Sequence, residues 1–303
     1  MSNIAFLFPG QGSQCTGMGK SLYDNVAESK AIFDRASTIL EDIDIKALCF
    51  DGSEDDLKKT ENTQPALVTV GIAIYEALRS KGISGNVFAG HSLGEITALC
   101  AAGYLSFEDA IKIARNRGLL MSKAGSDDEY GMAAVTNLDF DTVSKCMPES
   151  KDVVAANYNL KDQIVISGLS KAIEEVTPKL MEAGAKRVLP LKVSGAFHSH
   201  FMKNAADSLK EFLSNIEIKD STNKVYSNVT AEIHTKDSIK ENLYKQMFST
   251  VRWYNCMNNM KEQGITKIYE CGPGKVLVGM TKKISDSIEA IPIYDIDSLN
   301  SIA

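Results

Sequence analysis

Short apolar segments alternate with longer segments of helical periodicity along most of this 303-residue chain. Strands that alternate with helices are typical of an α/β fold with a parallel sheet. The clearest predicted helices are Gln64–Ser80 and Phe107–Met121. The predicted strands are Ile4–Phe8, Val87–Ala89, Lys224–Tyr226, Ile268–Tyr269 and Ile291–Ile293.

One stretch departs from this alternation and reads strand, helix, strand, strand, helix, strand. Its predicted elements are Gly131–Thr136, Asp139–Cys146, Val153–Asn157, Gln163–Ser167, Lys171–Ala183 and Arg187–Leu191. This β-α-β-β-α-β order is the ferredoxin-like pattern. Because the alternation resumes after about Ser194, we expect a small ferredoxin-like α+β domain, residues 128–194, inserted into a large α/β domain of residues 1–127 and 195–303. The cleft between the two domains is the natural place for a ligand.

The composition excludes several classes of protein. With 44% hydrophobic and 24% charged residues, the composition is typical of a globular protein. The net charge of −6 argues against a nucleic-acid-binding protein. The six cysteines lie far apart, so buried free thiols are expected rather than a zinc or redox site. No basic segment precedes the first strand, and the most apolar stretch, Ala66–Leu78, is shorter than the ~20 residues that span a bilayer. We therefore expect a cytoplasmic protein that binds neither nucleic acid nor membrane.

The strongest local motif is Gly90-His91-Ser92-Leu93-Gly94, directly after the predicted strand Val87–Ala89 and before a predicted helix, Glu95–Ala102. A tight turn from strand to helix needs small neighbouring residues and thrusts the central side chain out over the sheet edge. The G-x-S-x-G pattern in this context predicts that Ser92 is a nucleophile. The alternative is that Ser92 only caps the helix.

A serine hydroxyl is a weak nucleophile until a base, often histidine, takes its proton. The chain has four histidines. His91 lies inside the turn, and His234 lies in a polar stretch where we expect it to be exposed. His198 and His200 follow Gly195-Ala196-Phe197, where the chain re-enters the large domain at the edge of the predicted cleft. Either of these two can be the base, or a solvated loop histidine.

The glycine-rich loop Gly10–Gln14 follows the first predicted strand. Its spacing fits neither a dinucleotide fingerprint nor a Walker loop, because Cys15 and Gln14 stand where glycines are needed. Beside a serine turn, such a loop can present a main-chain N–H to an oxyanion, with the amide of Leu93 as the second donor. The alternative is a simple turn between a strand and a helix.

Arg117 is the most informative charged residue, because it shares a helix face with Ala110, Ala114 and Met121. An arginine on an apolar face seldom lacks a partner. That partner can be a protein carboxylate, or the free carboxylate of a ligand held by two hydrogen bonds. Arg115 points elsewhere on the helix and is expected to be solvated.

Eight short motifs follow one another along nearly the whole chain, from Ile4 to about Ile293. They are GQGSQ at 10–14, TQPAL at 63–67, GHSLGE at 90–95, RGLLM at 117–121, ANYN at 156–159, QIVISG at 163–168, GAFHS at 195–199 and CGPGKVL at 271–277. Together they resemble the bacterial malonyl-CoA:acyl carrier protein transacylases. The resemblance implies an α/β-hydrolase-like large domain with a ferredoxin-like insert. It also implies transfer of a malonyl group from malonyl-CoA to acyl carrier protein in fatty-acid biosynthesis, with no cofactor.

The same resemblance assigns the site residues. Ser92 is the nucleophile and His198 its general base, while the backbone amides of Gln11 and Leu93 form the oxyanion hole. The residues that contact the substrate or border its cleft are Arg117, which holds the malonyl carboxylate, Gln64, Asn157, Asn159 and Phe197. The main-chain carbonyl of Gln246 orients the histidine. Many relatives carry proline at the positions of Ala196 and Thr250, which concerns loop rigidity rather than chemistry.

Other functions remain open on the sequence. A trans-acting acyltransferase of polyketide synthesis is one alternative. A serine thioesterase or esterase would share Ser92 and the base but release its acyl group to water, although Arg117 argues against neutral esters. A catalytically inert scaffold would not need Ser92, His198 and Gln11 intact. Acyl carrier proteins are typically acidic in this family, so we expect docking on Lys275, Lys282, Lys283, Lys186, Arg187 and Lys192.

Overall fold

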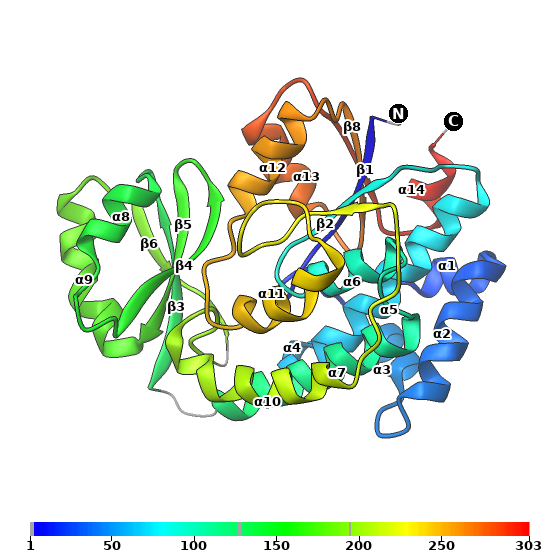
Figure 1. Cartoon of the computed structure of the whole chain (residues 1–303), viewed down its shortest axis with the longest axis horizontal. Coiled ribbons are helices and arrows are strands. Elements are labelled where there is room, and N and C mark those ends of the chain that lie inside the picture. Colours follow the sequence, from blue (N-terminus) through cyan, green and yellow to red (C-terminus); the bar gives the residue numbers. More distant parts are fainter. Residues whose placement is uncertain (1–2, 126–128, 194, 303) are drawn as a thin grey trace.

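Two sheets organise the computed structural model, which describes residues 3–125, 129–193 and 195–302. The five-stranded sheet is parallel, in the order β7-β2-β1-β8-β9, and the four-stranded sheet is antiparallel, in the order β4-β5-β3-β6. Figure 1 shows them in two neighbouring lobes, the antiparallel sheet in green. The predicted α/β class with a parallel sheet is confirmed.

Helices cover both faces of the parallel sheet, so the side chains of β1 are buried on both sides. Phe6 and Phe8 pack against Tyr75 of the long, almost wholly buried helix α5. Ala5 and Leu7 belong to a second core on the opposite face, with Trp253 and its neighbours. The strands are β1 (Ile4–Phe8), β2 (Val87–Gly90), β7 (Lys224–Val225), β8 (Lys267–Cys271) and β9 (Glu289–Ile293). These strands include every predicted strand of the large domain.

The helices of the large lobe come from both halves of the chain. The N-terminal half gives α1 (Lys20–Asn25), α2 (Ala27–Ile39), α3 (Ile45–Asp51), α4 (Glu54–Lys58), α5 (Thr60–Ser80), α6 (Gly94–Ala101) and α7 (Phe107–Ala124). The C-terminal half gives α10 (Lys203–Ser214), α11 (Ile239–Gln246), α12 (Trp253–Glu262), α13 (Val276–Ile284), α14 (Ile296–Asn300) and the 3₁₀ turns His200–Met202 and Lys236–Ser238. None of the helices in the described ranges is long and apolar enough to cross a membrane.

The small lobe follows the predicted element order and has its own apolar core. Its elements are β3 (Tyr130–Thr136), α8 (Phe140–Cys146), β4 (Val153–Leu160), β5 (Gln163–Leu169), α9 (Ser170–Glu182) and β6 (Arg187–Pro190). The domain boundaries predicted at 127/128 and 194/195 fall on residues 127, 128 and 194, which lie outside the described residues. The boundaries therefore stay predictions.

The loops that follow the parallel strands all lie at one edge of the large sheet, because parallel strands end at the same edge. The loop after β1 begins at Pro9, the turn after β2 holds Ser92, and Asn228 follows β7. The small lobe reaches the large lobe near this edge through β4, where the main-chain N–H of Tyr158 donates to Val251 O at 2.9 Å. The sheet edge and the small lobe together enclose the candidate site.

Candidate active site

Ser92 occupies a strained turn between β2 and α6, with φ at +52°. A residue with a side chain seldom adopts this left-handed conformation, and such strain is concentrated at functional sites. Two glycines make the turn possible. A Cβ on Gly90 would lie 1.8 Å from the carbonyl carbon of Gly94, and a Cβ on Gly94 would lie 2.1 Å from Phe8 O. The spacing of the motif is therefore a steric requirement of the turn.

His198 is the histidine that contacts Ser92. Its Nε2 lies 2.8 Å from Ser92 Oγ, and its Nδ1 donates to the main-chain oxygen of Gln246 at 2.7 Å. With the proton on Nδ1, Nε2 is free to accept the serine proton. Burial, reinforced by the charge of Arg117, lowers the pKa of His198 to about 3, so the imidazole is neutral at physiological pH. His200, the other candidate base, is exposed, and its ring lies tilted against that of Phe201.

Arg117 is 2% exposed and lies on the apolar face of α7, beside Ser92. Its Nη1 donates to Gln64 Oε1 at 2.9 Å, and its Nη2 donates to Ser92 Oγ at 3.1 Å and to Gln246 Oε1 at 3.0 Å. Burial lowers its pKa to about 10, which leaves the guanidinium charged at neutral pH. Within the described ranges Arg117 forms no ion pair, and its Nε has no hydrogen-bond partner. The sequence left open whether Arg117 pairs with a protein carboxylate or with the carboxylate of a ligand. The described residues place no protein carboxylate within ion-pair distance of it.

A cavity of about 250 Å³ opens between the two lobes over Ser92. Seven further residues predicted for the site lie on its wall: Gln11, Leu93, Arg117, Asn157, Asn159, Phe197 and His198. Gln64 and Gln246 are not among the lining residues, since both contact Arg117 from behind. Ten residues from seven separate segments of the chain are thus brought together, eight on the wall and two behind it.

The loop after β1 lies directly against the Ser92 turn, since a Cβ on Gly10 would lie 2.5 Å from the main-chain oxygen of His91. No described residue accepts a hydrogen bond from the main-chain N–H of Gln11 or from that of Leu93. Both residues line the cavity, and Leu93 precedes the first residue of α6. Two free N–H groups beside a hydroxyl are the arrangement that an oxyanion hole requires.

The small lobe contributes two asparagines from β4 to the cavity wall. Asn159 Oδ1 accepts a hydrogen bond from His91 Nε2 at 2.7 Å, which ties this lobe to the Ser92 turn. Asn157 forms a β-bridge with Val251 of the large lobe. The two asparagines therefore fix the small lobe over the cavity.

Two expectations about charged residues are wrong. His234 is 4% exposed, not solvated, and its Nε2 lies 2.8 Å from Glu95 Oε1. Its neighbours Glu232, Thr235 and Lys236 do face water, but the His234 side chain turns inward to the polar groups beneath the site. Arg115 pairs with Asp42 at 2.6 Å and donates to the main-chain oxygen of Glu61 at 2.7 Å, with 14% of its side chain exposed.

Asn228 is a site residue that the sequence reading missed. Its Oδ1 accepts from the main-chain N–H of Ser92 at 2.7 Å, and its Nδ2 donates to Gly90 O at 2.9 Å. These two bonds bracket the strained turn. The sequence shows only that Asn228 follows a predicted strand; its place beside Ser92 depends on the parallel pairing of β7 with β2.

Comparison with known proteins gives a consistent result. A family model for the acyl transferase domain matches residues 5–296. The malonyl CoA-acyl carrier protein transacylase of Bacillus subtilis (strain 168) is 45% identical over 304 residues, which cover 99% of this chain and 96% of that protein.

Solved structures of similar proteins cover nearly the whole chain. The crystal structure of an acyl carrier protein S-malonyltransferase from Vibrio cholerae O1 biovar eltor has a TM-score of 0.95 and 39% identity, and each chain covers 100% of the other. A type II PKS acyl-carrier protein in complex with its malonyl-transacylase gives a match with a TM-score of 0.95 and 36% identity, covering 99% of this chain and 98% of that one.

Proposed function

The chain belongs to the acyl transferase domain family, and we propose that it moves a malonyl group from malonyl-CoA to the phosphopantetheine thiol of acyl carrier protein in fatty-acid biosynthesis. The observation that carries this proposal is the buried guanidinium of Arg117, whose Nη2 lies 3.1 Å from Ser92 Oγ. The carboxylate of a malonyl group is one methylene away from the thioester carbonyl that Ser92 attacks. A charged donor beside the nucleophile therefore fits this substrate.

In the first half-reaction Ser92 Oγ attacks the thioester carbonyl while its proton passes to His198 Nε2. The negative charge that forms on the carbonyl oxygen is stabilised by the backbone amides of Gln11 and Leu93. The carbon–sulfur bond then breaks, His198 returns the proton to the leaving sulfur, and coenzyme A departs as a thiol. The malonyl group remains on the protein as an ester of Ser92.

In the second half-reaction the thiol of acyl carrier protein takes the place of coenzyme A and the same steps run in reverse. A pair of serine and histidine without a directly bonded carboxylate suffices, because a thiol of pKa ~8.5 is a good leaving group. These residues account for every proton and charge, so we propose that no cofactor takes part and that malonyl-CoA is a substrate only.

The remaining site residues support these two groups. Gln64 holds Arg117, Gln246 orients His198 through its main-chain carbonyl, and Asn157, Asn159 and Phe197 shape the acyl cavity. Arg117 also favours this function over a serine esterase or thioesterase, because a neutral ester offers nothing to a buried cation. A role in polyketide synthesis would use the same chemistry with another carrier protein.

We also propose the finer description of the fold. The strand order β4-β5-β3-β6 with two helices supports a ferredoxin-like domain, residues 128–194. The serine turn after β2 of a parallel sheet supports an α/β-hydrolase-like domain of residues 1–127 and 195–303. The free cysteines and the role in fatty-acid biosynthesis support a cytoplasmic location.

The carrier-protein half-reaction is expected to slow as salt rises. All six candidate docking residues are exposed, and Lys192 and Lys275 are neighbours in sequence of Leu191, Val193 and Val276 on the cavity wall. Attraction between these residues and an acidic partner is screened as the Debye length falls from ~10 Å at 0.1 M salt to ~3 Å at 1 M. Stopped-flow transfer from the malonyl enzyme to acyl carrier protein measures the effect.

Transfer to pantetheine, a small neutral thiol, is the control for this measurement. Its rate constant should change little with salt, since it needs no docking surface. If the two acceptors lose rate equally as salt rises, the basic residues do not guide docking.

The function itself is tested by whether Ser92 takes up a malonyl ester and passes it to a thiol. Intact-mass spectrometry after incubation with malonyl-CoA detects the ester. Loss of the ester on addition of a thiol, but not in buffer alone, separates transfer from hydrolysis.

A further inference from the structure

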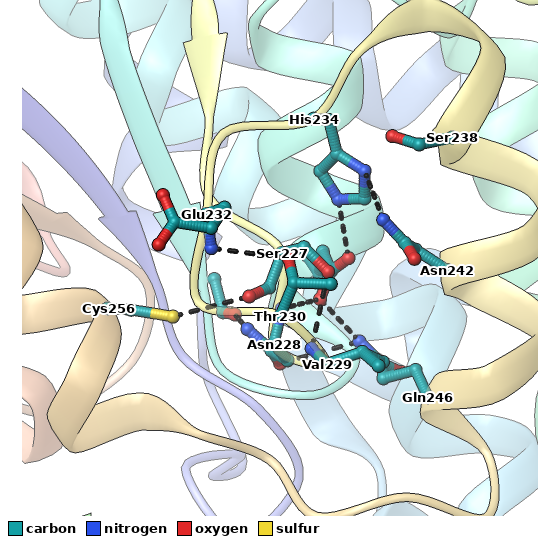
Figure 2. A network of polar contacts seen from close by, with 12 residues as sticks. Ser227, Asn228, Val229, Thr230, Glu232, His234, Ser238, Asn242, Gln246 and Cys256 are labelled. Carbon is teal, nitrogen blue, oxygen red and sulfur yellow. Dashed lines mark hydrogen bonds and ion pairs between the residues drawn. The ribbon is translucent and has the colours of Figure 1, made fainter.

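Glu95 is a fully buried carboxylate beneath the site, 0% exposed, in the first turn of α6. Its Oε1 accepts from His234 Nε2 at 2.8 Å. Its Oε2 accepts from the main-chain N–H of Asn228 and from Gln246 Nε2, both at 2.8 Å. Figure 2 shows His234 and Gln246 on the same side of Asn228, with Asn242 contacting the ring of His234. A carboxylate with three donors is held in one orientation.

Gln246 links Glu95 to the groups that carry the chemistry. Its Nε2 donates to Glu95 and to the main-chain oxygen of Ser92 at 2.9 Å, so its Oε1 must face the other way, toward Arg117 Nη2 at 3.0 Å. Its main-chain oxygen accepts from His198 Nδ1 at 2.7 Å. Glu95 and the main-chain oxygen of Ser92 together decide which end of the Gln246 amide meets Arg117.

Two groups of the site are positively charged during the reaction, and neither has a directly bonded carboxylate within the described part of the chain. Arg117 is a buried cation, and the reaction adds a second cation when His198 takes the serine proton. Among the residues that the structure describes, neither side chain forms an ion pair with a carboxylate. Glu95 acts against the effect of burial by raising the pKa of Arg117. Glu95 is the carboxylate through which the hydrogen-bond network can offset the positive charges of Arg117 and of protonated His198.

We propose that Glu95, held by His234, is a positioning residue that supplies the remote counter-charge of the reaction. Its carboxylate orients the side-chain amide of Gln246 toward Arg117 and offsets the imidazolium that forms at His198. In Ser-His-Asp triads this charge comes from a carboxylate bonded directly to the histidine. Here one glutamine stands between the two. The inference rests on the proposed function, because it takes His198 as the base that receives the Ser92 proton.

The substitution Glu95→Gln tests the role of the charge while keeping the shape. The new carbonyl can accept from Asn228 and Gln246, and the new amide N–H can face His234 in its other tautomer, so the fold is retained. Quenched-flow mass spectrometry with malonyl-CoA gives the rate constant and the amplitude of Ser92 acylation. The rate constant is expected to fall about 10- to 50-fold, the effect of one charge roughly 7–12 Å away at an effective dielectric constant of ~20. The amplitude should stay at one ester per molecule, and KM for malonyl-CoA should not rise.

Glu270→Gln is the matched control. Glu270 is as buried as Glu95, at 0% exposed, and accepts from the main-chain N–H groups of Leu277 at 3.0 Å and Val278 at 2.8 Å. It touches none of the residues that carry the chemistry, so Glu270→Gln should lower Tm and leave the acylation rate constant unchanged.

The outcomes separate this inference from the proposed function. An unchanged rate constant in Glu95→Gln overturns the inference alone, and so does a reduced amplitude at an unchanged rate constant, which would mean that Glu95 only stabilises the fold. If the wild-type protein forms no ester, the proposed function fails and the inference fails with it.

Discussion

Replacement of His198 by alanine is expected to slow malonylation of Ser92 about 10²–10⁴-fold while malonyl-CoA still binds. The reason is the geometry of the base, whose Nε2 lies 2.8 Å from Ser92 Oγ while its Nδ1 is held by the main-chain oxygen of Gln246. Without an acceptor for the serine proton, the hydroxyl remains a weak nucleophile. Single-turnover acylation measured beside equilibrium binding of malonyl-CoA separates the two effects.

His200→Ala is the matched control, since this exposed histidine lies two residues further along the chain. Its acylation rate should equal that of the wild type. Because the pKa of His198 is lowered to about 3, the wild-type rate should also show no decline as pH falls through ~6.5, the usual histidine value. A His198→Ala protein that acylates at the wild-type rate would move the role of base to another residue.

Arg117→Ala is expected to lower kcat/KM for malonyl-CoA roughly 30- to several-thousand-fold, while acetyl-CoA loses little. Loss of one partner of a desolvated charge pair costs ~2–5 kcal/mol, and acetyl has no carboxylate to lose. Arg117→Lys keeps the charge but not the two-pronged geometry, and should fall between the wild type and the alanine variant. The measurement is kcat/KM for both acyl-CoAs with all three proteins.

Arg115→Ala controls for the loss of an arginine from the same helix. Arg115 pairs with Asp42 at 2.6 Å and does not line the cavity, so its loss should leave the preference for malonyl over acetyl unchanged. Circular dichroism excludes unfolding in each variant. Equal losses for malonyl and acetyl in a folded Arg117→Ala protein would show that Arg117 is structural.

The parts of the molecule that local chemistry dictates could be predicted from the sequence. The turn at Ser92 requires Gly90 and Gly94 on steric grounds, so its motif reports the geometry directly. The apolar strand Ile4–Phe8 buries both faces, which is why a continuous hydrophobic run marks it. Elements of the small lobe were predicted to within a few residues because its strands and helices follow in a simple order.

The parts that depend on contacts between distant segments could not be predicted. Asn228 lies 136 residues from Ser92 in sequence, and only the parallel pairing of β7 with β2 brings them together. His234 stands among polar residues that face water, so its sequence neighbourhood gives no sign that its own side chain turns inward. Its partner Glu95 lies 139 residues away. The position of Gln64 behind Arg117, rather than on the cavity wall, likewise depends on how α5 packs against α7.

The ester on Ser92 is the central claim, and intact-mass spectrometry tests it most directly. Wild-type protein incubated with malonyl-CoA should gain the mass of one malonyl group, peptide mapping should place it on Ser92, and Ser92→Ala should gain nothing. Addition of acyl carrier protein should remove the group from the enzyme and place it on the carrier, while buffer alone leaves it in place. A wild-type protein that gains no mass, or a Ser92→Ala protein that gains the same mass, would contradict the account.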